Sequence, residues 1–227
     1  MQDLNAPPLN PLPPIVWIVA LPIIAMELVL SAGQYGIAGG PDAIGWRSIA
    51  VQNLAFSPEL MRYFWDSGRY PLDGMYRLVS YPLVHGGLTH AMFVIVIFAA
   101  LGKMVGEVFR WWAVAFLLLA STIAGALAYT LVPDLRAALI GGYPPVYGLI
   151  GAFTFLMLTR LQAEGGNQMR AFQLIGFLLG FQLVFGAIFG GGWEWVADLA
   201  GFVTGFALSF VISPGGWTRL RGRMRQR

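Results

Sequence analysis

The chain has 227 residues, of which 57% are hydrophobic and only 11% are charged, and its formal net charge is +3. Soluble domains carry roughly 25% charged residues, so this composition, with a mean hydropathy of +0.67, excludes an ordinary soluble protein and indicates an integral membrane protein. The absence of cysteine excludes disulfides and thiolate metal sites. So small a net charge gives no indication of nucleic-acid binding, and we predict no nucleic-acid partner.

Six stretches are long and apolar enough to cross a bilayer as helices, which takes roughly 20 residues each. The predicted spans lie at about residues 15–36, 89–105, 111–132, 145–161, 171–190 and 193–212. Tryptophans at several of their ends are typical of the membrane interface. We therefore expect an all-α membrane domain over residues 15–213, between a proline-rich arm (1–14) and a basic tail (214–227).

The basic residues predict the orientation and the compartment. Five of the thirteen arginines lie in the tail, at Arg219, Arg221, Arg223, Arg225 and Arg227. The positive-inside rule places this end, and after six spans also the N-terminus, in the cytoplasm. Lys103 is the one lysine, and the preference for arginine favours a GC-rich bacterial genome and therefore a bacterial inner membrane. The polar, proline-rich start has no basic n-region, so we expect no cleavable signal peptide.

The segment between the first two spans, residues 37–88, is too apolar to be a plain linker. Ser57, Pro58 and Glu59 predict a helix start, because serine favours the N-cap, proline the first position and an acid the first turn. Apolar residues follow at helical spacing, at Leu60, Met61, Phe64 and Trp65. We expect a short helix that lies in the membrane interface.

Four sequence landmarks follow one another along the chain. They are residues 75–80 (MYRLVS), 85–90 (HGGLTH), 141–151 (GGYPPVYGLIG) and 197–205 (ADLAGFVTG). In this order, and in these places relative to the spans, the landmarks resemble the rhomboid family of intramembrane serine proteases over roughly residues 60–212. The resemblance implies a rhomboid-like bundle of six transmembrane helices with a long membrane-associated first loop.

The same resemblance locates the positions of the catalytic dyad. Active rhomboids carry Gly-x-Ser-Gly at the start of the fourth span, where the serine is the nucleophile, and a histidine base in the sixth span. Alignment on residues 146–151 puts Tyr143 at the serine and Pro144 at the second glycine of that motif. Asp198 stands at the histidine. Both members of the dyad are therefore replaced.

Two further positions correspond to the region that stabilises the oxyanion in active rhomboids. The turn at His85 and the second histidine, His90, match the family, but valine replaces the family's asparagine at Val94. The family's Trp-Arg pair in the first loop corresponds to Tyr76 and Arg77. The resemblance thus places His90 and Val94 in the former oxyanion region.

These replacements remove the chemistry that a serine protease needs. A Ser–His dyad works because imidazole accepts the hydroxyl proton near neutral pH and returns it to the leaving group. A phenol with a pKa of about 10 is a poor acyl acceptor, and a carboxylate is a far weaker base. Val94 donates no hydrogen bond, and loss of one oxyanion donor costs roughly 10²–10³ in rate. We predict that the chain is not an enzyme and has no catalytic residue.

Other roles for the polar residues were weighed. His85, His90 and Asp198 are residue types that bind zinc, but the histidines are five apart and no HExxH motif exists, so we predict no metal and no cofactor. A simpler role for His90 is that of a hydrogen-bonded polar residue at a helix start. A carboxylate within a span indicates a function or a bound partner. We expect Asp198 to bond the Tyr143 hydroxyl or His90, as a structural clamp. The alternative is a neutral, protonated Asp198 that is hydrogen-bonded within the bundle.

Other features of the spans predict packing and contacts. Glu27, in the first span, is expected either to snorkel to the surface or to contact a partner protein. Gly201 and Gly205 predict close packing of the sixth span on the fourth. The phenylalanine-rich fifth span is expected to face lipid, and the alternative is a docking groove for another molecule.

The function predicted from these features is the non-catalytic binding of transmembrane helices of client or partner proteins, as inactive members of the family do. An alternative is a dedicated structural or assembly subunit of a larger membrane complex. Its contacts would be Glu27, the fifth span and the prolines of the arm (Pro7, Pro8, Pro11, Pro13 and Pro14). A minor alternative is an active intramembrane serine protease. The expected partners are membrane lipids and other transmembrane helices.

Overall fold

A computed structural model describes residues 11–216, apart from the side chain of Phe189. Among these residues, six helices are long and apolar enough to cross a membrane, which confirms the six predicted spans to within a few residues. They are α1 (Pro14–Gln34), α6 (Leu88–Gly106), α7 (Trp111–Thr130), α8 (Tyr143–Ala163), α9 (Gln173–Phe189) and α10 (Glu194–Ile212). The arginines of the predicted tail, together with Pro7 and Pro8 of the arm, lie outside the described residues.

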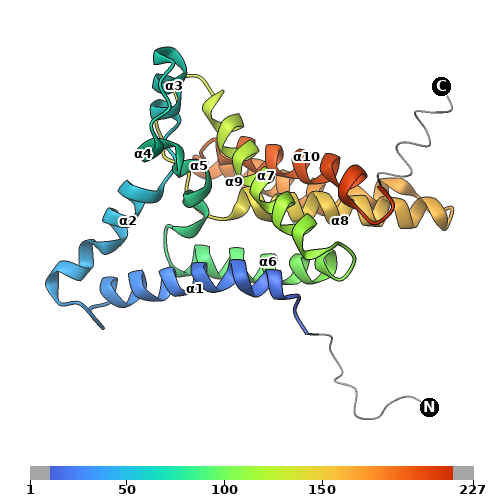
Figure 1. Cartoon of the computed structure of the whole chain (residues 1–227), viewed down its shortest axis with the longest axis horizontal. Coiled ribbons are helices and arrows are strands. Elements are labelled where there is room, and N and C mark those ends of the chain that lie inside the picture. Colours follow the sequence, from blue (N-terminus) through green and yellow to red (C-terminus); the bar gives the residue numbers. More distant parts are fainter. Residues whose placement is uncertain (1–10, 217–227) are drawn as a thin grey trace, which may run out of the picture.

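The first loop is helical over most of its length. It contains η1 (Pro41–Gly45), α2 (Trp46–Leu54), α3 (Pro58–Ser67), α4 (Leu72–Met75), α5 (Arg77–Ser80) and η2 (Tyr81–Leu83). The predicted start of α3 is confirmed, because the Ser57 hydroxyl accepts a hydrogen bond from the Leu60 amide at 3.2 Å. Figure 1 shows α2 leading away from the end of α1 toward α3 and α4, which project from one end of the bundle.

The α3 helix is tied to the end of α7 by one arginine. The Arg62 guanidinium donates to the backbone carbonyls of Thr130, Val132 and Leu135. The last carbonyls of a helix have no partner within the helix, so a cation placed there satisfies them and complements the helix dipole. The first loop is therefore fixed to the transmembrane bundle by charge as well as by apolar packing.

The closest packing in the bundle is between α8 and α10. A Cβ atom on Gly205 would lie 2.0 Å from the carbonyl oxygen of Gly148, and one on Gly201 would lie 2.1 Å from that of Pro144. The two backbones are therefore in direct contact, which confirms the close packing predicted from these glycines. This contact sets the N-terminal turns of α8 and α10 side by side, and those turns carry Tyr143 and Asp198.

The α9 helix is the least embedded of the six. Phe177, Phe181 and Phe185 are 69%, 52% and 46% exposed, whereas Phe172, just before the helix, packs against the core. All three phenylalanines line a groove beside the helix, so they are not a plain outer surface, and their contact with lipid stays a prediction. Weak attachment of this helix leaves space between it and its neighbours.

The glycine contact predicts a large effect from a single methyl group. Gly205→Ala should lower the free energy of unfolding by roughly 1–3 kcal/mol or more, because its Cβ collides with a backbone carbonyl that cannot rotate away. Gly176→Ala in α9 is the matched control, since no atom lies within 4 Å of that Cβ. Thermal unfolding in detergent measures both variants, and equal melting temperatures would contradict the packing.

Candidate functional site

The segment before α8 is a tight turn that only glycine fits. Gly141 has a φ of 90°, and its Cβ would lie 2.7 Å from the imidazole of His90. Its amide donates to the Tyr81 carbonyl at 3.1 Å. Burial, followed by the charge of Asp198, raises the pKa of the Tyr81 phenol well above its usual range, so the phenol stays protonated and donates to the Thr122 carbonyl. The turn therefore delivers Tyr143 to a fixed position at the start of α8.

Two histidines lie beneath this turn. The Nε2 atom of His85 accepts a hydrogen bond from the Gly142 amide at 3.3 Å, and the Nδ1 atom of His90 accepts one from the Gly86 amide at 3.3 Å. Within the described part of the chain, the other ring nitrogen of each histidine is buried without a partner. Both imidazoles therefore act as hydrogen-bond acceptors that fix the backbone, and His90 is bonded at its helix start as expected.

The aromatic ring at the position of the nucleophile is stacked. Tyr143 lies against His90 with ring centroids 5.2 Å apart and an interplanar angle of 20°. The neighbouring Val94 is buried, and a Cβ on Gly142 would lie 2.8 Å from its Cγ1 methyl. Tyr143 and Val94 thus fill the space beside His90 and Gly142 at the start of α8.

Asp198 has a partner that the sequence did not predict. Its Oδ2 atom accepts a hydrogen bond from the Gln182 amide at 2.9 Å, and the Gln182 carbonyl accepts one from the Tyr147 hydroxyl at 3.2 Å. The predicted bond from Asp198 to Tyr143 or His90 is wrong. The carboxylate faces α9 instead, where Gln182 supplies a donor. No group of three potential metal ligands forms among residues 11–216.

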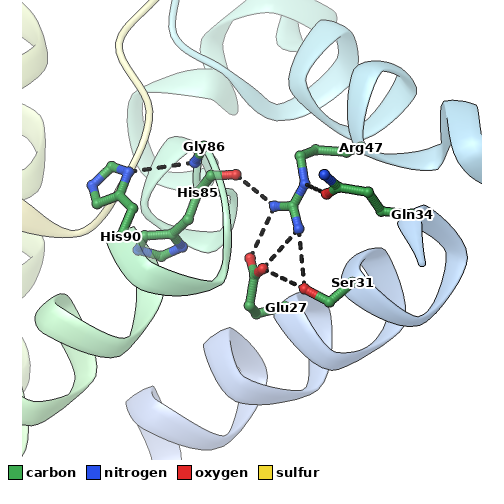
Figure 2. A network of polar contacts seen from close by, with 7 residues as sticks. All are labelled: Glu27, Ser31, Gln34, Arg47, His85, Gly86 and His90. Carbon is green, nitrogen blue, oxygen red and sulfur yellow. Dashed lines mark hydrogen bonds and ion pairs between the residues drawn. The ribbon is translucent and has the colours of Figure 1, made fainter.

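A buried ion pair supports the histidine turn from the other side. The Arg47 guanidinium donates to both carboxylate oxygens of Glu27, at 2.7 and 3.0 Å, and to the His85 carbonyl at 2.7 Å (Figure 2). Ser31 and Gln34 complete the network on α1. A bidentate pair is strong and geometrically specific. The network thus joins α1, α2 and the turn that carries His85.

Glu27 takes neither of the two arrangements expected from the sequence. Its side chain is only 4% exposed, so it does not snorkel to the surface. Arg47 occupies both of its oxygens, so the carboxylate is satisfied within the chain and has no need of a second protein. The physical reason is that Arg47, in the first turn of α2, lies against the last turns of α1, a tertiary contact that local sequence rules do not reveal.

A cavity of about 1220 Å³ opens beside this site. Its walls come from α6, α8, α9 and α10 and from the glycine loop at residues 190–192. Tyr143, Tyr147, Gln182, Glu194 and Asp198 contribute polar atoms, and most of the remaining lining residues are apolar or aromatic. The two positions expected to carry the dyad therefore face one common space, which is large enough for several side chains of another molecule.

Comparison with known families agrees with this arrangement. Residues 73–215 match the Rhomboid domain, which is well over half of the chain. The chain belongs to the rhomboid family. No curated protein matches the chain closely enough to count as a relative. The matched residues include the starts of α8 and α10, and the chemistry of the site depends on the residues found there.

Two residues of the site were missed by the sequence analysis. Gln182 is a polar residue in the middle of an otherwise apolar span, and such a residue needs a partner in the membrane. The need of Gln182 for a polar partner could therefore have indicated a hydrogen bond to Asp198, the carboxyl group of the next span. Arg47 had a weaker signal, namely that the buried Glu27 needs a cation from somewhere in the chain.

The ion pair predicts an asymmetry between single and double variants. Arg47→Ala should destabilise the protein by roughly 3–5 kcal/mol, because it leaves the Glu27 carboxylate buried and uncompensated. Adding Glu27→Leu to that variant should restore part of the lost stability, since the buried charge is then gone. Glu164→Gln is the control, because it breaks the exposed pair with Arg160 and should leave the melting temperature unchanged. A double variant less stable than Arg47→Ala would contradict the role of the pair.

The buried His85 predicts loss of stability in acid. Burial, and then the charges of His90 and Arg47, lower the pKa of His85 to about 4, against the opposing attraction of Glu27. In the unfolded chain, His85 binds a proton near pH 6.5. The contribution of the neutral, buried imidazole to the stability of the fold is therefore fully present above that pH and is lost as the pH falls toward 4. The loss by pH 4.5 should be roughly 2 kcal/mol.

The measurement is the melting temperature in detergent between pH 7 and pH 4.5. His85→Gln keeps an acceptor for the Gly142 amide but does not titrate, so its melting temperature should depend less on pH over this range. An identical pH dependence in the variant would show that other groups cause the effect.

Proposed function

We propose that this chain is a non-catalytic rhomboid-like membrane protein that binds transmembrane helices of client or partner proteins in the cavity between α6 and α9. We place it in a bacterial inner membrane with both termini in the cytoplasm. The observation that carries the proposal is the cavity of about 1220 Å³, onto which both Tyr143 and Asp198 open.

The non-catalytic part of the proposal is supported by the contacts of both residues. Tyr143 is stacked on His90, and Asp198 accepts the Gln182 amide, so neither is paired with a group to which it could pass a proton during acyl transfer. Ser121 is buried between α7 and α8, where Gly148 leaves room for it, and no imidazole bonds to it in the described residues. These contacts support the proposal that nucleophile, base and one oxyanion donor are all replaced.

The binding part is supported by the walls of the cavity. Aromatic residues of α6 and α9 line it, including Phe93 and Phe181, which are both more than half exposed. An apolar groove with a few polar groups at depth suits a helix that already lies in the membrane. Because α9 is only lightly embedded, a small displacement of this helix would widen the groove without disturbing the contact between α8 and α10.

The exposed phenylalanines of α9 also fit a second function, that of a dedicated subunit of a larger membrane complex. A permanent partner would cover the same surface of α9 that a client helix would contact only transiently. The two functions differ in stoichiometry, which makes them separable by one experiment.

The experiment is photo-crosslinking in native membranes. A benzoyl-phenylalanine at Phe181, which lines the cavity, should capture several membrane-spanning proteins at low yield. The same group at Phe116, which is 49% exposed on α7 and outside the cavity lining, is the control. One product at constant ratio would favour the dedicated subunit, and equal capture from both positions would contradict binding in the cavity.

A further inference from the structure

The charged residues of the cavity have one sign. Glu194 and Asp198 line it, and no lysine, arginine or histidine does so among the described residues. Glu194 is exposed at the mouth, in the first turn of α10, whereas Asp198 lies at the inner wall and is only 2% exposed. The cavity therefore presents acceptors to whatever enters it and lacks a cation of its own.

The spacing of the two carboxylates places them on one face of α10. Residues four apart are neighbours on a helix, about 6 Å apart along its axis. Like charges at this spacing repel each other unless a cation lies between them. Within the described part, Gln182 is the only donor that reaches Asp198, through Oδ2, so Asp198 keeps acceptor capacity for a further donor.

The apolar walls indicate the shape of the occupant. Phe177, Phe181 and Phe185 follow one another at intervals of four residues along α9 and span about 12 Å of its axis. A surface of this length matches the side of a helix. The rings of Trp193 and Trp195 at the mouth add aromatic faces that attract cations.

We propose that this cavity selects transmembrane helices that carry a lysine or arginine one or two turns inside the end that enters beside Glu194. The inference rests on the proposed function and names its ligand class. A basic residue within a span is costly in lipid, so a helix that carries one gains by leaving lipid for this cavity. The long apolar stem packs along the phenylalanines of α9, while the charged head reaches Glu194 and Asp198.

The test uses the full chain with benzoyl-phenylalanine at Phe181, in phosphatidylcholine vesicles. Three single-span peptides are compared that differ at one position, which is lysine, leucine or glutamate. The lysine peptide should crosslink roughly tenfold more than the leucine peptide, the size expected for one charge-assisted hydrogen bond. The glutamate peptide should crosslink least, because it adds a third negative charge.

Two variants and a control assign the preference to the carboxylates. Glu194→Gln, at an exposed position, and Asp198→Asn should each reduce the ratio of lysine-peptide to leucine-peptide crosslinking. Asp66→Asn removes an exposed carboxylate of α3 outside the cavity and should keep the full preference.

The contrary outcomes are distinguishable. Equal crosslinking of the lysine and leucine peptides would overturn the selection of basic helices and leave helix binding standing. No crosslinking above that from Phe116 would overturn the proposed function itself. Loss of the lysine preference on addition of phosphatidylethanolamine would also overturn the inference, because it would identify a lipid amine as the occupant.

Discussion

The contact between the backbones of α8 and α10 is the constraint on which the site depends. Glycine at 151, 201 and 205 lets the two helices approach until carbonyl oxygens lie where side chains would otherwise stand. In a membrane, lipid offers no hydrophobic drive for helix association, so close van der Waals packing of this kind is what holds helices together. It also fixes the first turns of both helices, so that Tyr143 and Asp198 open on one cavity.

The remaining polar contacts hold this arrangement from two directions. The pair of Arg47 with Glu27 fixes the carbonyl of His85, and His85 in turn accepts the amide of Gly142 just before α8. On the opposite side, Gln182 joins α9 to Asp198. These contacts therefore hold the starts of α8 and α10 in place from both sides of the site.

Much of the fold could be predicted from the sequence, because the membrane imposes strong rules on composition. The six spans follow from apolar length, the start of α3 from the Ser57 cap, and the α8–α10 contact from glycine spacing. The contacts of the acidic residues could not be predicted. The partner of Glu27 lies 20 residues away across an irregular loop, and the partner of Asp198 depends on the rotation of α9. Both contacts are set by tertiary packing, which local sequence rules do not contain.

The central claim is that this rhomboid lacks a working nucleophile and base, and labelling with a fluorophosphonate probe tests it most directly. The native protein is compared with a variant that carries Tyr143→Ser, Pro144→Gly, Val94→Asn and Asp198→His. The account predicts that the native protein stays unlabelled, whereas the variant gains a serine that the probe modifies. Labelling of the native protein at a site within the cavity would contradict the account.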